Sequence, residues 1–435
     1  MSRSASASSL YESLYIEKNG VKVDLSGKTI NFSYYESLLS PIITASMVIV
    51  DTGSSLQASK EQDSSERTGT IVSSLPIVGN EAVSFKIKSK LGTLNFERTP
   101  LYVNGAPVAK QEGSREVVAI NLISKAAKDN ETSIVNKKYK GNIADSVFKI
   151  LTEILKVPSN RIFIDPTFKN YNFFGGNKDP FTVLISLASK SIPNDNSDPG
   201  YFIYENQNGI NFKSISKLIS AEPVNKNNPY KKFSVLRKDD EENDYKILSM
   251  SQSRNQSLLN VLRSGVYSSR NIFFNPRTFE YKEVIVKLGE KGLKAHLGKD
   301  VQVPQEFGNY HRTHFHILDI GCLEDGIDIE TNNSPELWQA LSTVRYNLLF
   351  TQVLNITVPC NPNLKAGDVI ECLFEKRTTD NRNLGAYDDQ QSGRYLILDL
   401  SHNFDPTRSF TSLTLVRDTY GRYSKNSKSR GGLLG

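Results

Sequence analysis

The sequence predicts an α+β fold in which antiparallel β-structure predominates. Segments with an apolar residue at every second position lie near both ends of the chain, and Gly, Pro and Asn separate them. Helical spacing is confined to the middle of the chain and to one stretch after position 334. The length of 435 residues favours two to four domains, because single cores seldom grow past roughly 250 to 300 residues.

The first β domain is predicted over 21–125. Its expected strands are "TASMVIVDT" (44–52), "EAVSFKIKSK" (81–90), "GTLNFERT" (92–99) and "REVVAINLISK" (115–125). The polar stretch 53–69 is expected to be an exposed loop. Residues 1–20 begin with a Ser- and Ala-rich stretch that lacks a hydrophobic signal core, and we expect this segment to be flexible.

Residues 126–232 are predicted to form an inserted α+β domain. One helix is indicated by the helical spacing of Val147, Ile150, Leu151, Ile154 and Leu155. A second is expected to be capped by Asp179, with Pro180 at its first position and one apolar stripe formed by Phe181, Leu184, Ile185 and Ala188. The pair Asn208-Gly209 is typical of a tight hairpin turn that needs positive φ values.

The second β domain is predicted in two parts, 233–288 and 335–421. The first part contains a charged loop at 237–244 and a strand at 280–288. The segment 289–334 has little periodicity and is expected to be an inserted excursion. After it, a helix is expected to start with Ser334 as its cap and Pro335 at its first position.

The last predicted hairpin lies within 392–418, before a flexible basic tail at 422–435. Alternation predicts one shared face in the first strand for Leu396, Leu398, Leu400 and His402. It predicts the same in the second strand for Thr411, Leu413, Leu415 and Arg417. The opposite face is semi-polar, so we expect it to lie against a neighbouring element or subunit.

Two stretches indicate an internal repeat. "PIVGNEAVSFKI" and "NLKAGDVIECLF" share a Gly, a following acid and the same alternation. Each is followed by a second strand ("LNFERT" and "RYLILDL") and a third ("VVAINLISK" and "TSLTLVRD"). Two β-rich segments can also match this well by chance, and the sequence does not decide between duplication and coincidence.

Composition excludes several classes of protein. The net charge of +6, from 53 basic and 47 acidic residues, is too thinly spread for a nucleic-acid reader. The three cysteines are too scattered for a disulfide framework, which implies a reducing compartment, and Cys372 is expected to be a small buried hydrophobe. No apolar run approaches the roughly 20 residues of a membrane span, so we expect a soluble protein without membrane insertion.

One cluster in the sequence could carry chemistry, namely His311, His314 and His316. Three imidazoles could bind zinc, but on a strand His314 and His316 share a face while His311 points to the other. A polar surface strand or loop is the alternative. No nucleophile elbow and no phosphate loop are present, and Gly175-Gly176 with Lys178 indicates a lead into a capped helix. The acidic pairs 241–242 and 388–389 lie in charged loops. We therefore predict no catalytic, cofactor-binding or metal residues.

The order of several stretches resembles the baseplate hub proteins of contractile-tailed bacteriophages. These stretches are "FSYYESLLSPIITASMVIVDT", "LPIVGNEAVSF", "DPFTVLISLASKSI", "YFIYENQNGINFKSISKLI", "LKAGDVIECLF" and "GRYLILDLSHNFDPTRSFTSLTLVRDTYG". Together they span most of 30–421, without 289–334. The resemblance implies two related small β-barrel domains of the tube type in each subunit, separated by inserted α+β segments.

The resemblance also implies a non-enzymatic role in the virion. Three subunits would form a ring of six barrels that joins the six-fold tail tube to the three-fold cell-puncturing spike, with a lumen for the genome. The expected partners are the tail tube protein, a separate central spike protein and the baseplate wedge proteins, with DNA passing through unbound. The ring would be assembled in the host cytoplasm. The alternative is a baseplate enzyme, either a cell-wall hydrolase or a metalloprotein that uses the 311–316 cluster.

Overall fold

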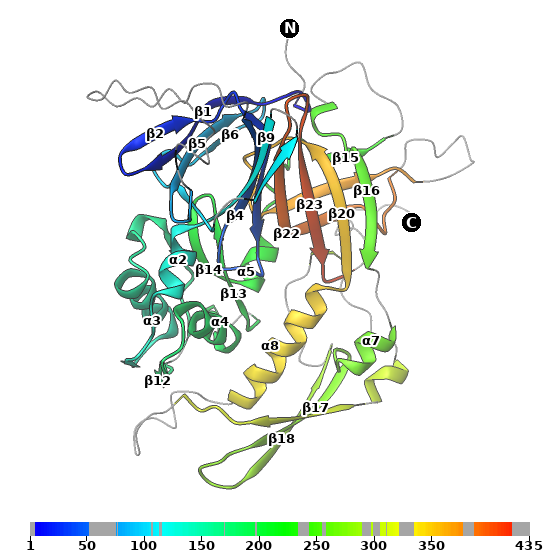
Figure 1. The fold of residues 1–435 in the computed structure, drawn as a ribbon. Coiled ribbons are helices and arrows are strands. Elements are labelled where there is room, and N and C mark those ends of the chain that lie inside the picture. The colour runs from blue at the N-terminus through cyan, green and yellow to red at the C-terminus, as the bar shows by residue number, and fades with distance from the viewer. Residues whose placement is uncertain are drawn as a thin grey trace.

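Most of the described strands in the computed structural model belong to one 15-stranded sheet. This sheet forms the upper part of the molecule as drawn in Figure 1. The structure describes residues 5–51, 75, 77–105, 108–112, 115–168, 170–195, 198–233, 243–254, 258–288, 297–298, 305–309, 311–321, 335–376 and 387–419. In spatial order, the main path of the sheet is β16 (Ser249–Arg254), β20 (Gln352–Pro359), β23 (Ser409–Arg417), β22 (Gly393–Phe404), β3 (Thr29–Ser37), β4 (Thr44–Asp51), β9 (Arg115–Ile123), β7 (Leu101–Val103), β5 (Ala82–Lys88), β1 (Leu10–Lys18) and β2 (Val21–Asp24).

Four short strands extend this path at its sides. They are β21 (Val369–Phe374) beside β22, β15 (Tyr230–Lys232) beside β21, β6 (Thr93–Asn95) beside β5 and β8 (Val108–Glu112) beside β9. All pairings in this sheet are antiparallel except that of β15 with β21. The predicted fold class, α+β with mostly antiparallel β-structure, is therefore confirmed.

The strands of the two predicted β regions pair in the same order. In the first β unit, β4 pairs with β9, β9 with β7 and β7 with β5. In the second β unit, β20 pairs with β23, β23 with β22 and β22 with β21. Within each set of four strands, the first in the sequence therefore lies beside the last. The predicted repeat matches "LNFERT" with "RYLILDL", but the strand in the corresponding position is β7, and among the described strands β6 pairs only with β5.

The two β units are continuous because β3 pairs with β22. The register runs from Ser37 opposite Asp399 to Phe32 opposite Phe404. Phe32 lies on the inner side, where its ring is 4.7 Å from that of Phe85 on β5 and 6.3 Å from that of Phe404. Since β5 lies several strands away from β3 along the sheet, this contact shows that the sheet curls over its own apolar face.

A β-bulge divides β22 into two parts. Ile397 lies opposite Leu415 and Asp399 opposite Thr414, so Leu398 is an extra residue in this strand. The extra residue exchanges the two faces: Leu396 and Leu398 pack in a cluster with α5, whereas Leu400 packs in the core of the sheet. The prediction that Leu396, Leu398, Leu400 and His402 share one face was therefore wrong.

The inserted α+β domain has a core of its own. Its elements are α2 (Lys125–Glu131), β10 (Lys138–Tyr139), α3 (Ile143–Lys149), a π-helical turn (Ile150–Ile154), a 3-10 turn (Ser159–Arg161), β11 (Ile162–Ile164), β12 (Phe173–Phe174), α4 (Pro180–Lys190), β13 (Tyr201–Asn206), β14 (Gly209–Ser214) and α5 (Ile215–Ser220). The Asp179 carboxylate accepts a 3.0 Å hydrogen bond from the Thr182 amide, as the cap prediction required. Ile185 is exposed and Leu187 is buried, so the predicted stripe was wrong at one position.

The hairpin turn of β13 and β14 is formed by Gln207 and Asn208, with Asn206 opposite Gly209. Gly209 has a φ of +142° and opens β14, whereas Asn208 is not among the described residues with positive φ. A Cβ at Gly209 would lie 2.1 Å from the carbonyl oxygen of Arg161. Glycine is therefore required here by close packing as well as by φ, which corrects the predicted Asn208-Gly209 turn.

A separate three-stranded sheet projects from the body of the molecule (Figure 1). It contains β17 (Ser268–Phe274), β18 (Tyr281–Lys287) and β19 (Arg312–Ile317), and it lies near α7 (Leu258–Arg263), a 3-10 turn (Gln305–Asn309) and α8 (Pro335–Leu349). The strand expected at 280–288 and the helix expected after position 334 are confirmed. The assignment of all of 233–288 to the second β domain was wrong, because β17 and β18 form the separate sheet and, of the strands described in this range, only β16 joins that unit.

Other boundaries also differ from those expected. Strand β1 pairs with β2 and β5, so the prediction that 1–20 is flexible was wrong over this strand. Strand β15 belongs to the large sheet, although 126–232 was expected to form the inserted domain. The predicted loop 53–69, most of 237–244 and the tail 422–435 lie outside the described residues, as do Ser334 and much of 289–334.

Candidate functional site

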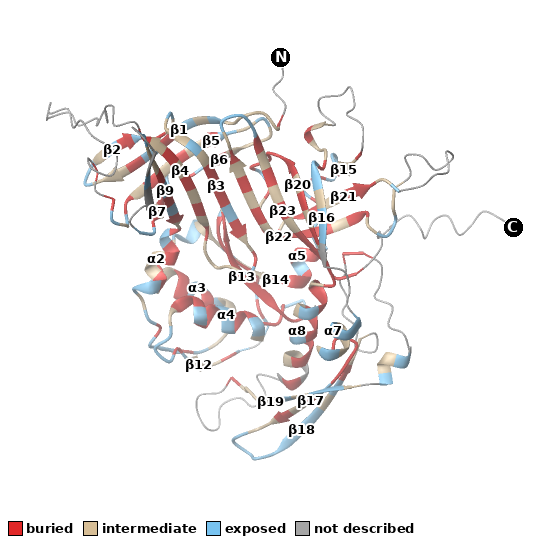
Figure 2. Cartoon of the chain, turned by 45° about the vertical axis from the view of Figure 1, so that its right-hand side comes forward, coloured by how far each residue is buried: buried red, intermediate tan, exposed pale blue. Residues whose placement is uncertain are grey.

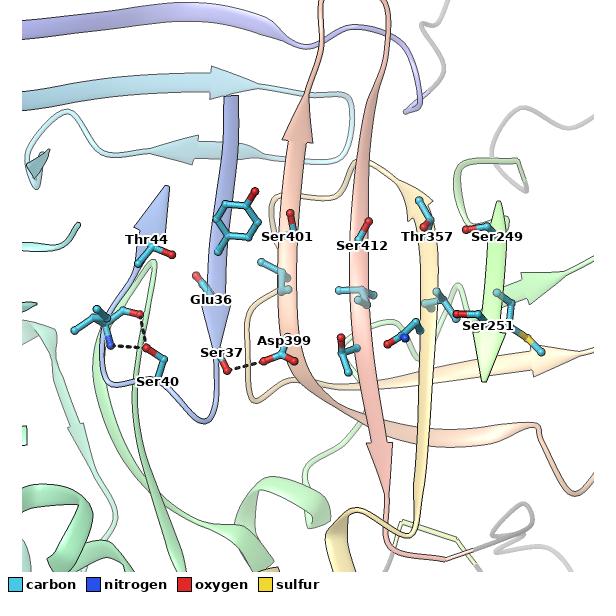
Figure 3. A pocket seen from close by; sticks show the side chains of 18 residues that line it. Glu36, Ser37, Ser40, Thr44, Ser249, Ser251, Thr357, Asp399, Ser401 and Ser412 are labelled. Carbon is cyan, nitrogen blue, oxygen red and sulfur yellow. Dashed lines mark hydrogen bonds between the residues drawn. The ribbon is translucent and has the colours of Figure 1, made fainter. Parts of the chain in front are cut away.

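The outer side of the large sheet carries a trough with a volume of about 660 Å³ (Figure 3). It crosses β16, β20, β23, β22 and β3 and ends at Thr44 on β4. The trough thus spans the junction of the two β units.

Rows of polar side chains, most of them small, form the floor of the trough, which we call the polar face. One row follows the strand register through Thr44, Tyr35, Ser401, Ser412, Thr357 and Ser249. A second row contains Ser37, Asp399, Thr414, Asn355 and Ser251. Alternation explains why these residues lie together, because their neighbours Leu354, Ile356 and Leu413 point into the core.

Hydrogen bonds between side chains connect the two β units across the polar face. The hydroxyl of Ser37 donates to Asp399 Oδ1 at 2.5 Å, and that of Ser33 donates to Asn403 Oδ1 at 2.9 Å. No Lys or Arg is among the residues that line the trough. Within these residues the surface is therefore rich in hydroxyl groups and free of positive charge.

The sequence predicted only part of this surface. It predicted a semi-polar face for the last hairpin, and Ser412, Thr414 and Ser401 lie there as expected. It missed the contributions of β3, β4, β16 and β20, because the pairing of β3 with β22 joins residues more than 300 positions apart. No local pattern in the sequence reports such a pairing.

A buried carboxylate, Glu36, lies beneath the polar face where three parts of the chain meet. Only 2% of Glu36 is exposed. Its Oε1 accepts hydrogen bonds of 2.7 Å from the Tyr34 hydroxyl and the Gln207 amide, and its Oε2 accepts one of 2.8 Å from the Ala366 amide. Burial raises the pKa of Glu36 to about 7, although these hydrogen bonds lower it. Glu36 thus joins β3 to the inserted domain and to the loop before β21.

The candidate histidines lie on or beside β19, outside the trough. His314 and His316 share a face as predicted, with ring centroids 6.2 Å apart. His316 stacks on Phe273 and its Nε2 lies 3.2 Å from Asn271 Oδ1, while His311 Nδ1 contacts the hydroxyl of Ser268. Burial lowers the pKa of His316. Among the described residues, no group of three or more His, Cys, Asp or Glu could hold a metal ion.

The remaining candidate positions have structural partners. Gly175 packs against Val135, where a Cβ would lie 2.4 Å from the carbonyl oxygen, so the glycine pair shapes the approach to α4. Asp388 Oδ1 accepts a 2.8 Å hydrogen bond from the Gln390 amide in a turn. Cys372 is fully buried, as predicted, and burial raises the pKa of its thiol. Within the part of the chain that the structure describes, no helix has the length and apolar character needed to cross a membrane.

Comparison with solved structures identifies the fold. The chain is similar to a tail protein from Neisseria meningitidis MC58, with a TM-score of 0.55 and 11% identity over 93% of this chain and 96% of that one. It is also similar to a 43 kDa tail protein of prophage MuSo2 from Shewanella oneidensis, with a TM-score of 0.52 and 10% identity over 94% and 98% of the two chains. No family model and no curated protein matches the sequence. The chain therefore has the fold of these tail proteins, in agreement with its resemblance to the baseplate hub proteins of contractile-tailed phages.

Proposed function

We propose that the protein is the structural hub of a contractile phage baseplate. Three copies form a ring that joins the six-fold tail tube to the three-fold spike, and the genome passes through the lumen of the ring. The role is structural rather than catalytic. The ring is a component of the virion tail and is assembled in the host cytoplasm.

The shared strand order of the two β units is the observation that carries this proposal. In each unit, a set of four strands (β4, β5, β7 and β9, or β20, β21, β22 and β23) places its first strand beside its last, followed by the third and the second. Three chains with two such units present six similar surfaces to a partner arranged in sixes. The inserted domain and the projecting sheet differ from each other, so the opposite side of the ring keeps three-fold symmetry.

We place the polar face on the lumen of the ring because of its chemistry. Its rows carry hydroxyl and amide groups and the carboxylate of Asp399, and the trough has no Lys or Arg among its lining residues. Cations that pair with phosphates supply most of the non-specific affinity of proteins for DNA. A wall without them lets DNA slide past, as a conduit requires.

The symmetry of each side of the ring decides which partner it binds. The tail tube protein binds the side with six β units, a separate central spike protein binds the three-fold side, and baseplate wedge proteins surround the hub. DNA remains unbound in the lumen.

Native mass spectrometry combined with electron microscopy of the purified protein tests the proposal. We expect a trimer at micromolar concentration and ring-shaped particles with six lobes around a central opening. A strictly monomeric protein, with and without a spike protein present, would overturn the hub assignment.

A further inference from the structure

The projecting sheet of β18, β17 and β19 carries large apolar residues on both faces, among polar and charged ones, but α8 covers only one face. On the covered side, Phe273 and Val286 pack in one cluster with Val344 of α8. On the other side Tyr281, Phe315 and Ile317 are 71%, 76% and 73% exposed. Strands that are apolar on both sides are typical of a sheet that is buried on both sides.

The exposed apolar residues form one continuous surface. The strand register places Phe274 between Tyr281 and Ile317, and it places Ile272 between Glu283 and Phe315. The ring of Phe274 is 5.0 Å from that of Tyr281. At the tip of the hairpin, Phe279 is 76% exposed and packs edge-on against Phe274. Figure 2 shows the exposure along β18. Surfaces of this kind mark sites of protein–protein interaction.

The two outer strands of this sheet are edge strands whose directions allow one to pair with the other in a neighbouring copy. Among the described strands, β18 and β19 each pair only with β17, β18 in the antiparallel and β19 in the parallel sense. The two outer strands therefore run in opposite directions, and they have similar lengths of seven and six residues. When two copies of the sheet lie side by side, β18 of one copy runs antiparallel to β19 of the next.

We propose that a second copy of the chain covers this surface, with β18 of each copy paired to β19 of its neighbour. This inference rests on the proposed trimer. Three sheets joined in this way close around the three-fold axis with their apolar faces inward. A barrel of nine strands has no room for a DNA duplex, so this closure belongs to the side of the ring that binds the spike and must open before the genome passes. The head-to-tail contact closes after three copies and leaves no exposed edge.

Charges on the exposed face favour this occupant. Glu283 already pairs with Arg270 of its own chain, with a 2.7 Å distance between Arg270 Nη2 and Glu283 Oε2. If the register of one copy continues into the next, the facing residues are Tyr281 with Ile317, Glu283 with Phe315, and Ile285 with Thr313. None of these pairs opposes two charges of the same sign.

Engineered disulfides test the pairing. In a Cys322→Ser background, Tyr281→Cys is combined in turn with Thr313→Cys, Phe315→Cys and Ile317→Cys, which allows for a shift in register. Within one chain β18 and β19 are separated by β17, so their Cα atoms lie about 10 Å apart. That separation exceeds the roughly 7 Å limit for a disulfide. We expect oxidation to give a covalent trimer with at least one pair, and reduction to reverse it.

Single variants and the native mass separate the outcomes. Tyr281→Cys and Ile317→Cys alone should not cross-link, and a covalent dimer from either would overturn the head-to-tail pairing. A protein that is trimeric under reducing conditions but cross-links with none of the three pairs would overturn this inference and leave the proposed hub intact. A monomeric protein would overturn both.

Discussion

The hydroxyl of Tyr34 donates a 2.7 Å hydrogen bond to the carboxylate of Glu36, two residues further along β3 and on the same buried side of the strand. The Tyr34 ring stacks against His402 of β22, with centroids 6.0 Å apart. The carboxylate also accepts bonds from the amides of Gln207 and Ala366. This pair therefore connects the first β unit, the second β unit and the inserted domain.

Replacement of Glu36 by alanine should destabilise the protein by on the order of 3 kcal/mol. The substitution leaves the amides of Gln207 and Ala366 buried without their acceptor. Chemical denaturation of the purified variant measures the effect. Glu17→Ala is the matched control, because Glu17 is half exposed in a 3.6 Å ion pair with Lys22 and should contribute less than about 1 kcal/mol. Equal stability of the two variants would contradict the role of Glu36 at the junction.

The raised pKa of Glu36 predicts a pH dependence of stability. The folded state holds a proton up to about pH 7, whereas the ordinary value is 4.5. The stability that the folded state gains from the proton on Glu36 is fully present below pH 4.5 and is lost as the pH rises through about 7. The shift corresponds to on the order of 3 kcal/mol. We expect wild-type stability relative to Glu36→Gln to be greater at pH 5 than at pH 8, as measured by denaturation at both pH values. A difference that does not change with pH would refute the shift.

A second buried group, His402, should give stability the opposite dependence on pH. Burial lowers the pKa of His402 from 6.5 to about 4, and its Nδ1 lies 2.9 Å from the hydroxyl of Thr411. The folded state favours the neutral ring of His402. The stability gained from this neutral ring is therefore present above pH 6.5 and is lost as the pH falls through about 4. We expect His402→Gln to lose less stability than the wild type between pH 6.5 and pH 4. If the two proteins show the same acid transition, another group must be responsible for it.

Local patterns predicted those features that depend on near neighbours in the chain. Alternation identified the strands around Met47 and Leu413, and the pair Asp179-Pro180 marked the start of α4. The bulge at Leu398 was missed, because a register shift depends on the partner strand. The period of two placed His314 and His316 on one face, but the surroundings of that face depend on residues far away in the sequence.

The polar face was only partly visible for the same reason. Its central contact, between Ser37 and Asp399, joins residues 362 positions apart. Each strand by itself shows only an unremarkable row of Ser, Thr and Asn. The trough arises when the two β units join along β3 and β22, and that pairing is a property of the whole sheet.

Lysine substitutions on the polar face should convert an inert wall into a DNA-binding one. Ser401 and Ser412 face each other across neighbouring strands near the centre of the trough and are half-buried. A double variant, Ser401→Lys with Ser412→Lys, adds two cations to each chain without changing the residues of the sheet that face the hydrophobic core. If the polar face lines the lumen, six lysines in a trimer surround the path of the DNA. We expect a gel shift with linear DNA that weakens steeply as the salt concentration rises.

The control for this prediction places two lysines elsewhere. Glu17→Lys with Asp24→Lys raises the net charge by four per chain, against two for the Ser401/Ser412 variant, and places this larger change on β1 and β2, at the far end of the large sheet. Electron microscopy of the variants with short duplexes locates the bound DNA. Density in the central opening for the Ser401/Ser412 variant alone agrees with a position on the lumen, because only that variant holds its lysines on the inner wall. DNA on the outer rim of both variants would place the polar face outside the lumen and would leave the shared order of the two β units as the remaining support for a ring.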